Sequence, residues 1–290
     1  MGAGPAAGII VPAMEPVARR LFRLYEHVHL VTMFCTEPSQ AQVDLGLRDN
    51  YWDGYFASRS GPLGRVPAAV VHAIFYNFAP GEVARHIPRV WDTVTPEQAI
   101  AARQEGSVAA LRRILGDLAD GPGIARAAEL ATRAGTGAPT EGRTLYAAIR
   151  TLPVPEEPLA RLWHASMLLR EHRGDGHIAA LLSESVGGTE SHVLHAVSQG
   201  MPAEKFGRVH HLPAAQLGAV VDGMRERGLL VDSTRLTDAG REKKARVEAI
   251  TDDLAAAPWE DFEPAEIDRL AADLEPLSER LGGAGIPKPV

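Results

Sequence analysis

Apolar residues at helical spacing are the feature that most limits what this chain can fold into. In the segment Glu15–Cys35 they recur at intervals of three and four, which places them on one helix face, at Val17, Leu21, Leu24, Val28 and Val31. The same pattern predicts further helices over about 38–47, 51–60, 66–78, from 96 onward, 156–173, 213–227, 238–257 and 264–281. Leu229–Leu236 is short and β-rich, so we expect two small strands there. The sequence therefore predicts a mainly α fold with small β wings.

Several helix ends are marked by their own residues. Thr95 and Thr237 each stand where a hydroxyl would cap the first turn of a long helix. Gly228 follows a predicted helix at a position where a positive φ ends it. The turn Gly174–Gly176 is expected to break a helix, so that a shorter one begins near His177.

The run Pro213–Arg246 resembles the second half of a MarR-type winged helix. The family pattern is a helix ending in R-x-R-G-L-L, a wing, and then L-T-x-x-G-R at the start of a long helix. Its counterparts here are Arg225, Arg227, Gly228, Leu229 and Leu230, followed by Leu236, Thr237, Gly240 and Arg241. The resemblance covers about Gly187–Ala257 and implies a winged-helix domain. The whole chain also resembles an uncharacterised actinobacterial family of helix-rich proteins, through Tyr55–Gly64 and Glu171–His177, which implies no activity.

The first half of the chain repeats this plan faintly. Pro67 and two alanines open an apolar helix as Pro213 and two alanines do, and Val94–Gln98 opens a long helix as Leu236–Gly240 does. We therefore expect two tandem winged-helix-like halves plus a C-terminal helix, with chance similarity between alanine-rich helices as the alternative. Because 135–142 reads as a linker, the predicted division is a helical, degenerate winged-helix-like domain at 14–116, a linker with a short helix at 117–143, the MarR-like domain at 144–258 and a final helix at 259–282.

Composition excludes several classes of protein. The net charge of -7 gives no general attraction to phosphate backbones. Cys35 is the single cysteine, which excludes an internal disulfide and a thiolate metal cage. Met1–Ala13 lacks the basic start of a signal peptide, and no apolar run approaches the roughly 18 residues of a membrane span. We expect a cytoplasmic protein with no membrane partner.

The predicted recognition helix is poor in side chains that read DNA. Base-contacting positions near its N-terminus are held by Ala214, Ala215, Gln216, Leu217 and Gly218, of which only Gln216 has a suitable amide. The wing offers only Arg235, beside Asp232. Nucleic-acid binding is therefore not expected. The alternative is a MarR-type DNA-binding regulator, a symmetric dimer that would use Gln216 and Arg235.

Arg170–His177 is the densest group of chemically active residues. It contains Arg170, Glu171, His172, Arg173, Asp175 and His177 at the predicted helix–turn–helix corner. A neutral histidine beside carboxylates is suited to general-base catalysis, so His172 and His177 are candidate catalytic residues. His164 lies eight residues before His172, on roughly the same helix face. The alternative is a capping and salt-bridge knot that only fixes the corner.

Two segments of the first half add candidate ligand-binding residues. Arg59, next to a Gly-Pro-Leu-Gly turn, can hold a carboxylate or phosphate in a bidentate fork, or tie the turn to helix carbonyls. The helix expected at 66–78 is apolar enough to be buried, yet contains His72, Tyr76 and Asn77. Buried polar groups need partners. These could partner each other, the corner at 170–177, or a ligand.

These observations favour a small-molecule-binding protein on a winged-helix scaffold that no longer reads DNA. The ligand is expected to be an anionic or polar aromatic organic molecule, held in a crevice between the two halves. Catalysis, where present, would be cofactor-free acid–base chemistry. We expect no cofactor and no metal site, because His192 and His195 lack an H-E-x-x-H arrangement. Binding without turnover, a homodimer and a purely partner-binding role remain open.

Overall fold

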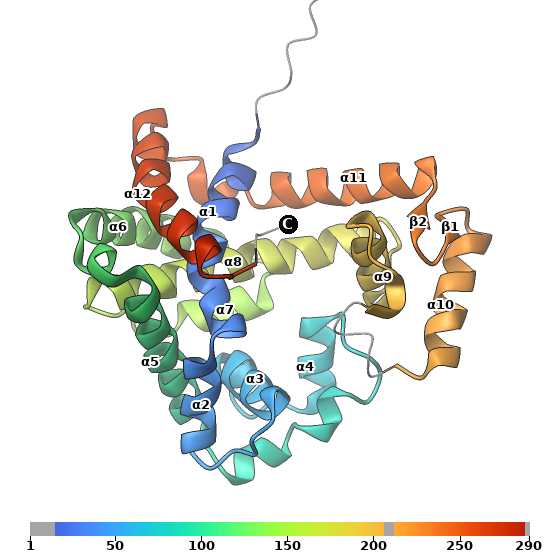
Figure 1. Cartoon of the computed structure of the whole chain (residues 1–290), viewed down its shortest axis with the longest axis horizontal. Coiled ribbons are helices and arrows are strands. Elements are labelled where there is room, and N and C mark those ends of the chain that lie inside the picture. The colour runs from blue at the N-terminus through green and yellow to red at the C-terminus, as the bar shows by residue number, and fades with distance from the viewer. Residues whose placement is uncertain (1–14, 206–211, 288–290) are drawn as a thin grey trace, which may run out of the picture.

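A computed structural model describes residues 15–205 and 212–287 of the chain. Figure 1 shows an assembly of helices with one small antiparallel hairpin. The helices are α1 (Val17–Phe34), α2 (Thr36–Asp44), α3 (Tyr51–Ser60), α4 (Ala68–Phe75), α5 (Pro96–Leu115), α6 (Pro122–Gly137), α7 (Thr144–Arg150), α8 (Pro158–Ser183), α9 (Gly188–Ser198), α10 (Ala214–Glu226), α11 (Asp238–Leu254) and α12 (Pro264–Gly283); the strands are β1 (Leu230–Asp232) and β2 (Arg235–Leu236). The predicted fold class, mainly α with a small β element, is confirmed.

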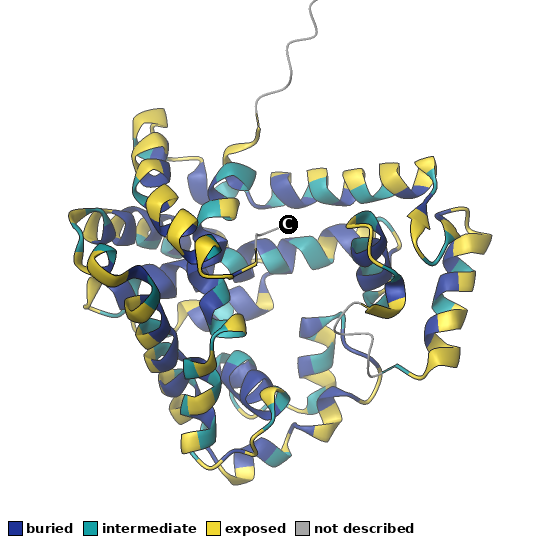
Figure 2. Cartoon of the chain, in the orientation of Figure 1, coloured by how far each residue is buried: buried dark blue, intermediate teal, exposed yellow. Residues whose placement is uncertain are grey.

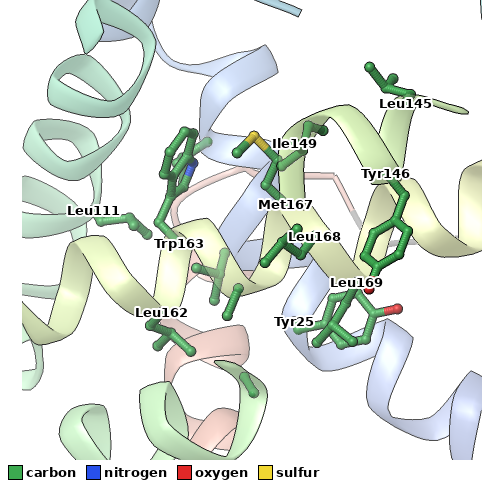
Figure 3. Packing of buried hydrophobic residues seen from close by; sticks show 14 of the residues in the cluster. Tyr25, Leu111, Leu145, Tyr146, Ile149, Leu162, Trp163, Met167, Leu168 and Leu169 are labelled. Carbon is green, nitrogen blue, oxygen red and sulfur yellow. The ribbon is translucent and has the colours of Figure 1, made fainter. Parts of the chain in front are cut away.

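The helix α8 is the axis of the larger hydrophobic core. Its Trp163, Met167 and Leu168 pack with Tyr146 of α7 and Tyr25 of α1, as Figure 3 shows. Helices α5, α6 and α12 complete this core. The C-terminal helix thus packs against α1, at the other end of the sequence (Figure 1).

A second, smaller core lies at the C-terminal end of α8. There Ala180 and Leu181 pack with apolar residues of α9, α10, the hairpin and α11, in an order of elements that fits a helix-turn-helix followed by a wing. The strands pair with Leu230 opposite Leu236. Helix α11 then runs back along α8 toward the first core (Figure 1). The two cores meet within α8, and the segment 117–143 contains the whole of α6, which packs in the first core. The predicted domain division remains a prediction.

One predicted helix break is wrong: α8 continues without interruption through Gly174–Gly176. Two contacts from outside the helix explain the residues there. Asp175 accepts a hydrogen bond from the backbone N–H of Tyr146 at the start of α7, at 3.0 Å. Gly176 leaves space for the guanidinium of Arg143, which a Cβ would collide with. The aspartate and glycine therefore serve helix packing rather than a turn.

The predicted helix ends are confirmed where a local signal was present. The Thr95 hydroxyl and the Gln98 side chain form a capping box at the start of α5. The Thr237 hydroxyl accepts a hydrogen bond from the Gly240 N–H at 3.0 Å. Gly228 has φ +70°, which favours glycine, and directly precedes the hairpin.

Helix α4 is shorter and less buried than its apolar sequence predicted. Only Val71 and Phe75 are buried, and Val70 is 41% exposed (Figure 2). The helix ends at Tyr76, whose hydroxyl donates to the Val186 carbonyl at 2.6 Å. Its two buried residues join the larger core, while Tyr76 and Asn77, which follow the helix, contact α9 and the residue Val186 before it. Within residues 15–143 no strand follows it, so the tandem repeat remains a prediction.

Candidate functional site

A pocket of about 180 Å³ lies where α1, α8, α9 and α11 approach one another. It belongs to both parts of the molecule, because α1 comes from the larger core while α9 and part of α11 belong to the smaller one. Its apolar walls are Phe22, Leu181, Leu194 and Val247. The polar and charged lining residues are Glu26, Arg170, Arg173, His177, Ser191, His195, Lys244, Glu248 and Thr251.

The uninterrupted course of α8 aligns three predicted site residues on this pocket. Arg170, Arg173 and His177 are separated by three and four positions, so a continuous helix presents them on one face. Gly174 lies on the same face of α8 and adds no side chain to the lining of the pocket. These three residues were predicted to lie at a helix–turn–helix corner, and they lie instead on one face of a continuous helix.

Glu26 of α1 is a buried carboxyl group of the pocket lining that lacks a hydrogen-bond partner for one of its oxygens in the described part of the chain. Its residue is 5% exposed, and its Oε2 has no hydrogen-bond partner among the described residues. Its Oε1 accepts a hydrogen bond from Arg170 Nε at 3.2 Å. Burial raises the pKa of the Glu26 carboxyl to about 7, against the opposing effect of Arg170. Glu26 therefore brings to the pocket a carboxyl group with a raised pKa and one buried oxygen that has no partner among the described residues.

Behind the lining of the pocket, buried ion pairs hold Arg170 in place. Glu171 accepts from Arg170 Nη1 at 2.7 Å and receives a bidentate pair from Arg59, at 3.1 and 2.9 Å. Arg59 also donates to the Tyr55 hydroxyl at 2.7 Å and lies over the ring of Phe75. Burial alone would raise the pKa of Glu171, but the two guanidinium groups hold it well below its usual range. The fork predicted for Arg59 is thus filled by a carboxylate of the chain itself.

A second set of ion pairs surrounds the pocket, one between α8 and α11 and one within α11. Arg173 contacts Asp252 at 2.8 Å and lies over the ring of Phe22. Lys244 and Glu248 form an ion pair one turn apart on α11. The side chains of Arg173 and Asp252 are only 8% and 5% exposed. These pairs neutralise most of the charge around the pocket, so the unpaired Glu26 oxygen stands out chemically.

His177 contributes a neutral imidazole to the pocket. Its Nδ1 lies 3.0 Å from the Thr251 hydroxyl, which itself donates to the Val247 carbonyl at 2.6 Å. The hydroxyl proton is therefore used, and Nδ1–H must be the donor to Thr251. This leaves Nε2 unprotonated. Burial lowers the pKa of His177 to about 4 and also lowers the pKa of His195.

The structure places the remaining predicted residues of α8 away from the pocket. His172 is 1% exposed, packs edge-on against the Tyr146 ring, and has no partner for either ring nitrogen among the described residues. His164 is equally buried in the larger core. Burial lowers the pKa of both imidazoles to about 4. Burial raises the pKa of Asp175 to about 6, and that carboxylate serves the start of α7.

The candidates from α4 join α9 instead of the pocket. The Asn77 carbonyl lies 2.8 Å from His192 Nε2, and the Tyr76 hydroxyl binds Val186. His72 is half-buried on α4. Of the residues predicted to line one crevice, Arg170, Arg173 and His177 line this pocket, whereas Arg59, His72 and Tyr76 do not.

Sequence reasoning missed the pocket residues from α1, α9 and α11. Glu26 stands on a helix with an apolar face, between Leu24 and Val28, and a carboxylate at that place was the available signal. His195 was weighed only as part of a metal pair. Lys244 stands in a charged stretch of the sequence, and its contact with the pocket depends on how α11 packs against α8.

The outer face of α10 and the hairpin is exposed but electrically balanced. Gln216 is exposed near the start of α10, and the Arg235 side chain is 67% exposed in the wing. Each arginine of this face lies beside a carboxylate: Arg225 with Asp222, Arg227 with Glu190, Arg235 with Asp232, and Arg241 with Asp238. A phosphate would have to compete with these carboxylates.

Two searches of the described residues gave negative findings. No helix there is both long and apolar enough to cross a membrane. No group of three or more His, Cys, Asp or Glu side chains in that part of the chain is arranged to hold a metal ion.

Comparison with known proteins gave one match. The model of a helix-turn-helix family matches residues 18–288 of the chain. Neither the curated proteins nor the solved structures gave a match.

Proposed function

The chain belongs to this helix-turn-helix family, and on that premise we propose that it binds a small polar organic molecule in the pocket between α1, α8, α9 and α11. The observation on which the proposal rests is the buried Glu26 carboxyl, whose Oε2 has no partner among the described residues. An unpaired buried acceptor costs about 1–3 kcal/mol, and a ligand that donates to it recovers that free energy.

The size and lining of the pocket indicate the class of ligand. A volume of about 180 Å³ is near that of an engineered cavity of about 150 Å³ that binds benzene. Phe22, Leu181, Leu194 and Val247 supply apolar walls for one ring. Glu26 and His177 Nε2 supply acceptors, which favours an amine or hydroxyl group on the ligand. We therefore favour a single-ring, polar aromatic molecule, and among the predicted classes the neutral or cationic form over the anionic one.

The proposal is one of binding, and we assign no reaction. Of the two predicted bases, His177 lines the pocket and His172 does not. Glu26, with its pKa of about 7, is better tuned than either imidazole for proton exchange near neutral pH. Any cofactor-free acid–base step would therefore begin with Glu26.

Three single-ring compounds of similar size test the proposal: benzylamine, benzyl alcohol and benzoate. The thermal midpoint is measured with each at about pH 8 and at about pH 6, on either side of the Glu26 pKa. Above that pKa the carboxylate accepts, so benzylamine and benzyl alcohol should raise the midpoint and benzoate should not. Below that pKa the protonated carboxyl donates, so benzoate should raise the midpoint more than at about pH 8 and benzylamine should raise it less. At about 100 times its Kd a ligand stabilises by about 2.7 kcal/mol, a shift of several degrees.

Glu26→Gln should remove the pH dependence of this ranking, because its amide does not titrate. Glu129→Gln, the same change at an exposed position on α6, is the matched control and should behave as the wild type. The proposal fails when none of the three compounds shifts the midpoint, or when Glu26→Gln leaves the ranking and its pH dependence unchanged.

DNA binding is the second candidate function, and the exposure of Gln216 and Arg235 favours it. The paired arginines and the alanine-rich start of α10 weigh against it. A MarR-type regulator would need duplex affinity from this face, which polarisation of labelled DNA measures directly.

A further inference from the structure

A second polar feature lies apart from the pocket: Arg103 of α5. The residue is 4% exposed, and its Nε and Nη2 have no hydrogen-bond partner among the described residues. Other arginines of the interior are engaged. Arg59 and Arg170 bind Glu171, and Arg143 donates to the carbonyls of His172 and Leu254. Arg103 is therefore a buried cation with donors to spare.

The charges around Arg103 add to the free-energy cost of burying its guanidinium. Burial opposes its charge most strongly; Glu171 and then Tyr55 favour the charge, whereas Arg59 and then Arg170 oppose it. Glu171 is already bound by both of those arginines. Burial lowers the pKa of Arg103 to about 10, which still leaves it charged at neutral pH. A buried charge without a hydrogen-bonded partner is strongly unfavourable, so this part of the interior has an excess of positive charge.

A small recess adjoins the guanidinium. Its volume of about 20 Å³ is enough for about one water-sized group. Gln42 and Ser58 add polar atoms to its wall, while Tyr51 and Met33 lie at the more exposed end. Tyr51 is 40% exposed, and its hydroxyl lies 3.5 Å from Met33 Sδ. The recess shares no lining residue with the pocket that contains Glu26. The recess thus has the cationic Arg103 at its buried end, and Tyr51 and Met33 at its exposed end, or mouth.

We propose that Arg103 binds the carboxylate head group of a small organic acid, whose apolar part rests against Tyr51 and Met33. A carboxylate supplies the negative charge and the acceptors that the Nε and Nη2 donors lack. Because the recess admits about one water-sized group, one carboxylate oxygen enters it and the rest of the ligand lies at its mouth. The acid can be a free small carboxylate or the head of a larger molecule, and two probes separate these sources.

Saturation-transfer NMR on the wild-type chain tests the site with formate and with hexanoate. Both should receive saturation from the protein, hexanoate more strongly because its chain contacts the mouth. Arg103→Gln should weaken the apparent affinity by about tenfold to a hundredfold, the range for hydrogen bonds to a charged group. Arg113→Gln, the same change at an exposed position ten residues along α5, should leave it unaltered.

A measurement on the wild type alone covers the case in which Arg103→Gln does not fold. Hexanamide has the same chain and no charge, so it should receive little saturation and should not displace hexanoate, whereas formate should. Equal transfer to hexanamide and hexanoate overturns the proposal, as does binding that survives Arg103→Gln or the absence of transfer to both acids. Transfer to formate alone overturns the placement of the apolar part at Tyr51 and Met33.

Discussion

The pocket and the outer face of α10 both contain arginines paired with carboxylates, yet the two sets of pairs differ in burial. In the pocket, the side chains of Arg173 and Asp252 are 8% and 5% exposed. On the outer face, those of Arg225 and Asp222 are 53% and 66% exposed. Exposed pairs contribute little because water screens them, whereas buried charges depend on each partner. The charges that this scaffold has removed from water are therefore around the pocket rather than on the face that would meet DNA.

The largest expected difference between the buried and the exposed ion pairs is in how much each contributes to the free energy of unfolding. Glu171→Gln leaves the guanidinium groups of Arg59 and Arg170 buried without their shared anion, so we expect a loss of about 3–5 kcal/mol in the free energy of unfolding. Asp222→Asn breaks an exposed pair on α10 and should cost less than about 1 kcal/mol. Urea unfolding monitored by circular dichroism gives both values. Equal losses would show that burial does not distinguish the two regions.

The pH dependence of stability isolates Glu26. Because its pKa in the folded chain is raised from 4.5 to about 7, its contribution is fully present below pH 4.5 and is lost as pH rises through about 7. Glu26→Gln removes this titration. The free energy of unfolding of the variant, relative to that of the wild type, should therefore rise by up to about 3 kcal/mol between about pH 5 and about pH 8. Asp175, raised to about 6, acts in the same direction in both proteins and cancels in the difference. Urea unfolding at both pH values measures it, and parallel curves would place the Glu26 carboxyl in a water-like environment.

Freeing the arginines of the outer face should increase the affinity of the chain for DNA. The triple change Asp222→Asn, Asp232→Asn and Asp238→Asn removes the carboxylates beside Arg225, Arg235 and Arg241. Each freed cation that contacts a phosphate steepens the slope of log K against log salt by about 0.9, so the slope should change by up to about 3. Titrations of a labelled duplex at several salt concentrations measure it. An unchanged slope would mean that the pairing does not limit phosphate contact.

Local signals in the sequence were enough for much of the fold. Thr95, Thr237 and Gly228 each mark a helix end with their own chemistry, and the short, β-rich segment Leu229–Leu236 predicts the hairpin. The break predicted at Gly174–Gly176 was wrong because the residues that use Asp175 and Gly176 lie on other elements. A glycine that makes room for a distant arginine has the same local pattern as one that ends a helix.

The candidate site was less predictable, because it depends on contacts between distant segments. Arg170 meets Glu26 across 144 residues, and Arg59 meets Glu171 across 112. The sequence selected Arg170, Arg173 and His177 by their density, and the register of α8 then separated them from His172. Glu26 has no such neighbours in the sequence, so only the packing of α1 against α8 singles it out.

Fluorescence polarisation of a pooled, labelled DNA duplex at low salt tests most directly whether binding belongs to the pocket rather than to α10. Non-specific affinities of DNA-binding proteins typically fall near 10⁻⁴ to 10⁻⁶ M, so a titration to tens of micromolar protein decides the question. We expect no salt-sensitive rise in polarisation from the wild-type chain. A clear rise that Gln216→Ala and Arg235→Ala together abolish would contradict the account and make the α10 face the functional surface.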